Sequence, residues 1–196
     1  SDTTTITTST VGGSITVSNV ASETVGQLSV VQGTSVNLQS VTAINLQISG
    51  GDGPDLVVGA TSTLNLNGAN PIEVGLLIGA TGVINGAMTF SSTGAASHRL
   101  TAIDGGAIIF NDGAEFTAGQ GFVGNPFGGT NLSSVVFDSG ASYVCIAGGN
   151  PFGAPEPDSV VVFRKGSLFS LQANVTPSFA GRTYANFELN VPEHEV

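Results

Sequence analysis

The residues of this chain that could do chemistry are few and scattered. Only His98-Arg99 with nearby Asp104 brings a histidine, a base and an acid into one local group. A Ser-His-Asp hydrolase with a nucleophile elbow would show a G-x-S-x-G motif, and the sequence contains none. Polysaccharide lyases and hydrolases need a basic residue that takes a proton, or two carboxylates across a cleft. Because the chain has only four basic residues, we predict that it is not an enzyme.

One acidic turn has the spacing of a metal site. The segment Gly50-Gly-Asp52-Gly53-Pro-Asp55-Leu56-Val57 fits the calcium nonapeptide G-G-x-G-x-D-x-U-x. Asp52 and Asp55 could supply the carboxylate oxygens that calcium prefers. Such sites form between successive tandem copies, however, and this chain has one copy. We therefore predict a solvated acidic turn, with a calcium site at Asp52 and Asp55 as the alternative, and no other cofactor.

Two further motifs have simpler structural interpretations. The run Gly119-Gln-Gly-Phe-Val-Gly124 matches the dinucleotide fingerprint, but Asn125-Pro126 follows where a helix would have to begin. Cys145 is the only cysteine, so the chain can form neither an intrachain disulfide nor a cysteine-based zinc site. We predict that Cys145 is a small buried hydrophobic residue.

Composition narrows the class of protein. The chain has 196 residues, a formal net charge of −10, 28 glycines and a hydrophobic fraction of 40%. That fraction excludes an acidic disordered tail, and no apolar run reaches the ~18 residues of a membrane span. Four basic against fourteen acidic residues remove the positive patch that nucleic-acid binding requires. We predict one extracellular domain that neither binds nucleic acid nor inserts into a membrane.

An internal repeat indicates the elements that must position these residues. A short apolar alternation ends at an anchor glycine six times, with Gly113 as a rival anchor inside the longest interval. The anchors are Gly33, Gly59, Gly79, Gly105, Gly140 and Gly166. At the fifth position after each anchor, we predict interior side chains at Leu38, Leu64, Ile84, Phe110, Cys145 and Leu171. At the sixth position, we predict a column of amides near one corner, at Gln39, Asn65, Asn85 and Asn111.

This pattern predicts an all-β fold: a single-stranded right-handed parallel β-helix, or solenoid, of about six rungs. We expect one domain over residues 1–196, with an irregular first rung or donated strand at 1–20, rungs at 21–172 and a cap at 173–196. In the cap, Pro177, Phe179 and Phe187 would cover the last rung. The repeated Gly124-Asn-Pro-Phe-Gly128 and Gly149-Asn-Pro-Phe-Gly153 predict surface turns at the same corner of adjacent rungs.

Several blocks between residues 100 and 190 resemble a known class of protein. They are Val136-Phe137-Asp-Ser-Gly-Ala-Ser-Tyr143, Gly149-Asn-Pro-Phe-Gly153, Pro157-Asp-Ser-Val-Val-Val-Phe163, Gly166-Ser-Leu-Phe169 and Pro177-Ser-Phe-Ala-Gly-Arg-Thr-Tyr-Ala-Asn-Phe187. In this order they resemble a β-solenoid segment of large secreted Bacteroidetes surface proteins, cargo of type IX secretion. The resemblance implies a cell-surface or extracellular location and no catalytic residue.

We therefore expect a non-catalytic structural or adhesive module of a secreted or cell-surface bacterial protein. The alternative is a carbohydrate- or calcium-binding module, with an extracellular glycan as partner. The first rung presents β-prone segments at residues 3–8 and 15–17, with no charge beyond Asp2 to repel a partner. Because open strand edges invite pairing, we also expect the chain to associate with itself end to end through this N-terminal end, and to form filaments.

Overall fold

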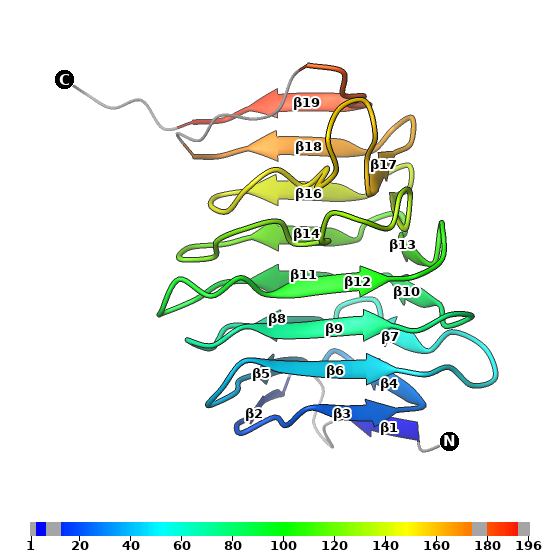
Figure 1. Cartoon of the computed structure of the whole chain (residues 1–196), viewed down its shortest axis with the longest axis vertical. Helices are drawn as coiled ribbons and strands as arrows, with labels where there is room; N and C mark the ends of the chain where they lie inside the picture. Colours follow the sequence, from blue (N-terminus) through cyan, green and yellow to red (C-terminus); the bar gives the residue numbers. More distant parts are fainter. Residues whose placement is uncertain (1–2, 7–12, 174–179, 192–196) are drawn as a thin grey trace.

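The chain folds into a parallel β-solenoid of about six turns, as the sequence predicts. The computed structural model describes residues 3–6, 13–173 and 180–191, and in these ranges every regular element is a strand. Strands in front run left to right and those behind run right to left while the chain rises from the N-terminus (Figure 1), so the solenoid is right-handed. No helix long and apolar enough to cross a membrane occurs in the described part.

The strands form three sheets, and all pairs within them are parallel. Sheet A contains β1 (Thr3–Ile6), β4 (Gln27–Val30), β7 (Leu56–Val58), β10 (Gly82–Ile84), β13 (Ile108–Phe110), β15 (Val135–Phe137) and β17 (Val161–Phe163). Sheet B contains β2 (Ser14–Val17), β5 (Ser35–Leu38), β8 (Thr63–Leu66), β11 (Ala87–Phe90), β14 (Glu115–Ala118), β16 (Ser142–Cys145), β18 (Leu168–Leu171) and β19 (Asn186–Leu189). Sheet C contains β3 (Glu23–Val25), β6 (Ile44–Ile48), β9 (Ile72–Leu76) and β12 (Arg99–Ala102).

The strand register fixes the length of one turn of the solenoid. Gly82 lies beside Ile108, Ile108 beside Val135, and Val135 beside Val161, so successive turns here are nearly equal in length. Each early turn adds one strand to each sheet. Because side chains alternate along a strand, the same residues line the interior at every level.

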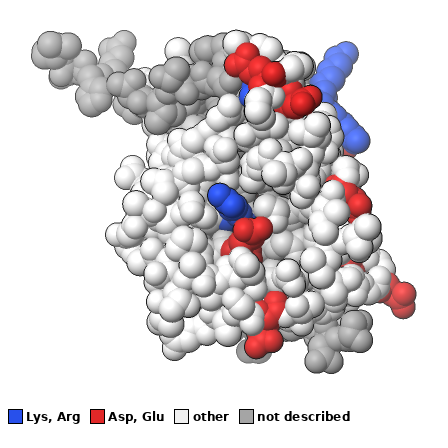
Figure 2. All heavy atoms as spheres, viewed as in Figure 1, with Lys and Arg blue, Asp and Glu red and all other residues white. Residues whose placement is uncertain are grey.

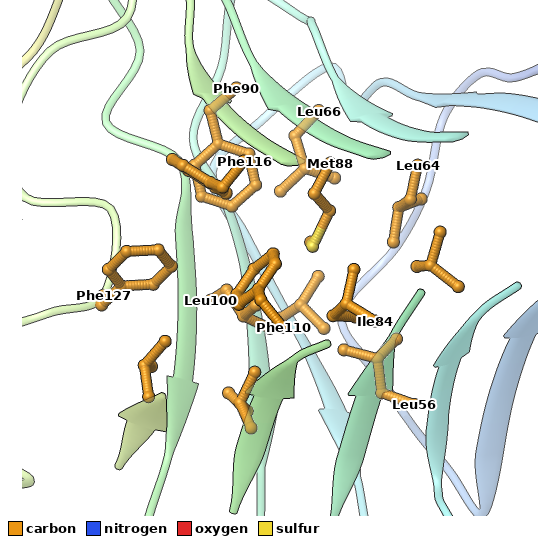
Figure 3. Close-up of a cluster of buried hydrophobic side chains, with 14 of the residues drawn as sticks. Leu56, Leu64, Leu66, Ile84, Met88, Phe90, Leu100, Phe110, Phe116 and Phe127 are labelled. Atoms are coloured by element: carbon orange, nitrogen blue, oxygen red, sulfur yellow. The ribbon is translucent and has the colours of Figure 1, made fainter. Parts of the chain in front are cut away.

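The core changes from aliphatic to aromatic along the axis. Near the middle, Leu56, Leu64 and Ile84 point toward the same interior as Phe110 and Phe116 (Figure 3). Further on, rings stack directly along the axis. Phe110 and Phe137 are parallel with centroids 4.5 Å apart, and Tyr143 and Phe169 are parallel at 5.0 Å. Buried side chains therefore fill the interior along the described part of the solenoid.

The six apolar positions predicted to lie inside are all buried, at 0–3% exposure, which confirms that prediction. They do not form one column, however. The anchors Gly33, Gly59, Gly140 and Gly166 lie between strands of sheets A and B, whereas Gly79 and Gly105 lie between sheets C and A. Gly113 holds the A-to-B position in its turn, and its N–H donates to the carbonyl of Gly140 at 3.2 Å. Both kinds of turn follow an apolar strand and use left-handed glycines, so they look alike in sequence.

The predicted single column of amides is consequently wrong. Only Asn85 and Asn111 stack as expected, with Nδ2 of Asn111 donating to Oδ1 of Asn85 at 2.8 Å. Asn65 instead donates to Asn37 on sheet B at 3.0 Å. Gln39 lies directly after strand β5, and its side-chain amide donates to that of Asn67 at 2.9 Å. The amides do bond along the axis, but in separate columns.

Beyond β12, loops replace the strands of the third side. The two Asn-Pro-Phe turns lie there one above the other, because the N–H of Gly149 donates to the carbonyl of Gly124 at 2.7 Å. This confirms their common corner. The turns are not wholly on the surface, however, since Phe127 and Phe152 are buried. Their rings fill the core space that strands of sheet C fill in the earlier turns.

Both ends of the solenoid extend the sheets. β1 and β2, within the segment 1–20, pair with β4 and β5. β19, within the segment 173–196, pairs with β18 and places the ring of Phe187 parallel to that of Phe169. Residues 7 and 8 of the N-terminal segment, and Pro177 and Phe179 of the expected cap, lie outside the described residues.

Candidate functional site

The outward side of sheet C is a polar surface. In β6, Ile44, Leu46 and Ile48 face the core, while Asn45 and Gln47 face outward. The register stacks the outward residues of the four strands and the residue before β3 into two columns. One column contains Ser22, Asn45, Glu73 and Arg99, and the other contains Thr24, Gln47, Gly75 and Thr101.

Two adjoining hollows follow these columns. The first, of about 280 Å³, is lined by Ser22, Ala43, Ile44, Asn45, Pro71, Glu73, Ser97 and Arg99. The second, of about 410 Å³, is lined by Ser22, Glu23, Thr24, Asn45 and Gln47. Because they share Ser22 and Asn45, they form one shallow depression, which we call the sheet C groove. Figure 2 views this side and shows a basic group beside an acidic group within a largely uncharged surface.

Hydrogen bonds hold some of these side chains in place. Oγ1 of Thr101 donates to Oε1 of Glu73 at 3.0 Å, and Oγ1 of Thr24 donates to Oε1 of Gln47 at 3.3 Å. Arg99 lies directly beside Glu73 in the register. In the part of the chain that the structure describes, its guanidinium makes neither a hydrogen bond nor an ion pair. The groove thus presents amide, hydroxyl, carboxylate and guanidinium groups to solvent.

The structure does not bring His98, Arg99 and Asp104 together. Strand alternation buries His98 and turns Arg99 outward. Asp104 lies in the loop between β12 and β13, where its Oδ2 accepts the N–H of Gly79 at 2.6 Å. This group therefore has no shared site at which a catalytic step could take place.

His98 instead links neighbouring turns of the solenoid. Its Nδ1 accepts the N–H of Ile72 at 3.1 Å, and its Nε2 lies 3.0 Å from the carbonyl oxygen of Ser91. Both bonds are satisfied only by the neutral ring with its proton on Nε2. Burial lowers the pKa of His98 below 6.5, although hydrogen bonds to the backbone at Ser91 and Gly68 oppose this.

Asp52 and Asp55 have different environments. Asp55 is buried, and its carboxylate accepts the N–H of Gly51 at 2.6 Å and that of Thr81 at 2.8 Å. Asp52 is exposed, and its backbone oxygen accepts from Gln27 at 2.9 Å. The predicted solvated acidic turn is therefore wrong for Asp55, whose buried carboxylate joins its own loop to the following coil of the solenoid, and it holds only for Asp52. No three His, Cys, Asp or Glu residues within the described ranges gather as a metal site. Calcium binding at the pair stays a prediction.

The other motifs of the sequence are structural. Cys145 is buried as predicted, and burial raises the pKa of its thiol to about 11, so it is not a reactive thiolate. The run Gly119–Gly124 leads into the turn that contains Pro126, without a helix to hold a pyrophosphate.

Sequence reasoning missed the residues of the sheet C groove. Asn45 and Glu73 belong to no motif, and Arg99 stands out in the sequence only beside His98, which faces the other side of the strand. The available signal was the alternation of apolar and polar residues at 44–48 and 72–76. The spacing of the anchor glycines does not contain this signal.

Comparison with known proteins adds no relative: no family model, curated protein or solved structure matches this chain.

Proposed function

We propose that the chain is a non-catalytic adhesive module of an extracellular or cell-surface protein, a rigid solenoid that presents the sheet C groove to a ligand. The groove is the observation that carries this proposal. Polar side chains from four successive turns converge there on a surface held by buried strands. The resemblance to type IX secretion cargo supports the external location.

A non-catalytic role fits the use of two chemically capable groups outside the groove. The ring of His98 and the carboxylate of Asp55 are both buried and both bond to backbone groups of neighbouring turns. A general acid or base must reach a proton of the substrate. These two groups reach only the protein itself.

A glycan is the ligand class that the groove fits best. Sugar rings present hydroxyl groups that both donate and accept, and the groove offers both functions at Asn45, Gln47 and Glu73. The columns run along the solenoid axis, so an extended oligosaccharide would meet a new side chain at each turn, about every 4.8 Å.

Glycan-array binding tests this proposal. The chain should bind oligosaccharides without cleaving them, and the double variant Asn45→Ala/Gln47→Ala should lose most of the bound signal. Thr89→Ala is the matched control, because Thr89 faces outward from the middle of sheet B. The control should bind normally. Cleavage of a bound glycan, or equal loss in the control, would overturn the proposal. A parallel calcium titration of Asp52→Asn/Asp55→Asn tests the alternative metal site.

A further inference from the structure

We propose that the sheet C groove selects acidic glycans and that Arg99 binds the carboxylate of a sugar. This inference rests on the proposed function and deepens it. It begins from the scarcity of positive charge, because the whole chain has four basic residues.

Two of the other three basic residues have structural partners. Arg164 pairs with Asp138 at 3.0 Å. Arg182 donates to the backbone oxygens of Ala154 and Asp158 and lies over the ring of Phe152. Arg99 is different, since among the described residues its guanidinium has no such partner and it lines the groove.

The neighbouring acid, Glu73, does not form an ion pair with Arg99. Glu73 is its register partner, yet no ion pair joins them, and Thr101 holds one oxygen of Glu73 from the other column. The guanidinium therefore keeps its paired donors for a ligand. A planar carboxylate accepts two parallel hydrogen bonds from such a group, which a neutral hydroxyl cannot do.

The rest of the groove is suited to the uncharged part of an acidic sugar chain. Ser97 lines the hollow beside Arg99, and Asn45 and Ser22 follow along the axis. Three strand spacings of ~4.8 Å give a column about 15 Å long, enough for a short oligosaccharide. Glu73 lies between Arg99 and Asn45 and can accept sugar hydroxyls.

The negative net charge of the protein means that only a direct contact can favour an acidic glycan. At −10 the chain repels polyanions at long range. An acidic glycan can bind only by contact at a specific group, and nonspecific adsorption of the kind seen with basic proteins is disfavoured. Preference for the acidic member of a matched pair of glycans would therefore report on Arg99 directly.

The test uses acidic oligosaccharides that contain galacturonate, mannuronate or glucuronate, each beside its carboxyl-reduced form. The full chain should bind at least one acidic member about tenfold more tightly than its reduced partner, the factor expected for one charge-assisted contact. Arg99→Gln should abolish that preference, because the affinity for the acidic member should fall to that for the reduced form. Arg99→Lys should keep part of it. Arg164→Gln is the control and should behave as the wild type.

The outcomes separate this inference from the proposed function. If neutral glycans bind at the groove and Arg99→Gln has no effect on preference, the acidic selectivity is wrong and the adhesive function stands. If no glycan binds, or if only an acidic peptide such as oligoglutamate binds, both are overturned. Unchanged thermal unfolding of Arg99→Gln will show that its fold is intact.

Discussion

Replacing His98 by leucine should destabilise the protein severely. The ring is fully buried and holds the N–H of Ile72 and the carbonyl of Ser91. Leucine is of similar size but removes the partner of the buried N–H of Ile72 and that of the part-buried carbonyl of Ser91. Each orphaned group costs about 1–3 kcal/mol, so we expect a loss of about 2–6 kcal/mol. A typical domain has only about 5–15 kcal/mol of stability in total.

The same residue should make stability depend on pH. Because burial lowers the pKa of His98 in the folded chain, the unfolded chain takes up a proton first as the pH falls below 6.5. Stability should therefore be complete above pH 6.5 and decline as the pH falls toward the folded-state pKa. One such group contributes a slope of at most about 1.4 kcal/mol per pH unit.

Urea unfolding at pH 7.5 and 5.5 measures both effects. His98→Leu should lower the midpoint at pH 7.5 and lose the part of the pH dependence that wild type shows between 6.5 and 5.5. His98→Asn retains an acceptor for Ile72 and should fall between the two. The other histidine, His194, lies outside the described residues, and His194→Gln serves as the control for the slope. If His98→Leu is as stable as wild type, the assignment of these hydrogen bonds is wrong.

Three further changes test the packing and the ends of the solenoid. Tyr143→Phe removes a fully buried hydroxyl that has no hydrogen-bond partner in the described part, so it should raise stability by about 1–3 kcal/mol in urea unfolding; a loss would show that the hydroxyl is bonded. Gly153→Ala should destabilise more than Gly79→Ala in the same assay: both have left-handed φ, but only a Cβ at 153 would overlap the backbone oxygen of Gly128, so equal losses would contradict the tight stacking. Glu23 lines the groove and is exposed at the N-terminal edge of sheet C, where a charge discourages strand addition. Glu23→Val should promote end-to-end association in sedimentation velocity, and a monomer at high concentration would argue against the N-terminal contact.

The interior of this fold was predictable, because burial depends on a local property. Each of Leu38, Ile84 and Phe110 follows a glycine turn in a short apolar alternation, and any such strand in a solenoid buries alternate residues. The same signal does not predict to which of the three sheets each strand belongs. Turns from A to B and from C to A both need a left-handed residue, as Gly140 and Gly79 show with the same φ of 82°. Spacing from the anchor glycines therefore predicts the wrong column for residues such as Asn65 and Gln39.

The groove could not be predicted from the sequence for the same reason. Asn45, Glu73 and Arg99 are ordinary surface residues one by one, and only the register of β6, β9 and β12 makes them neighbours. His98 and Arg99 illustrate the opposite error: adjacent in sequence, they face opposite sides of one strand. In a parallel solenoid, residues one coil apart in the sequence lie side by side and can form a common site, whereas neighbours within a strand face opposite sides. On sheet C the length of one coil is the interval from Asn45 to Glu73 and from Glu73 to Arg99. This interval predicts which residues share a functional surface more directly than any local motif does.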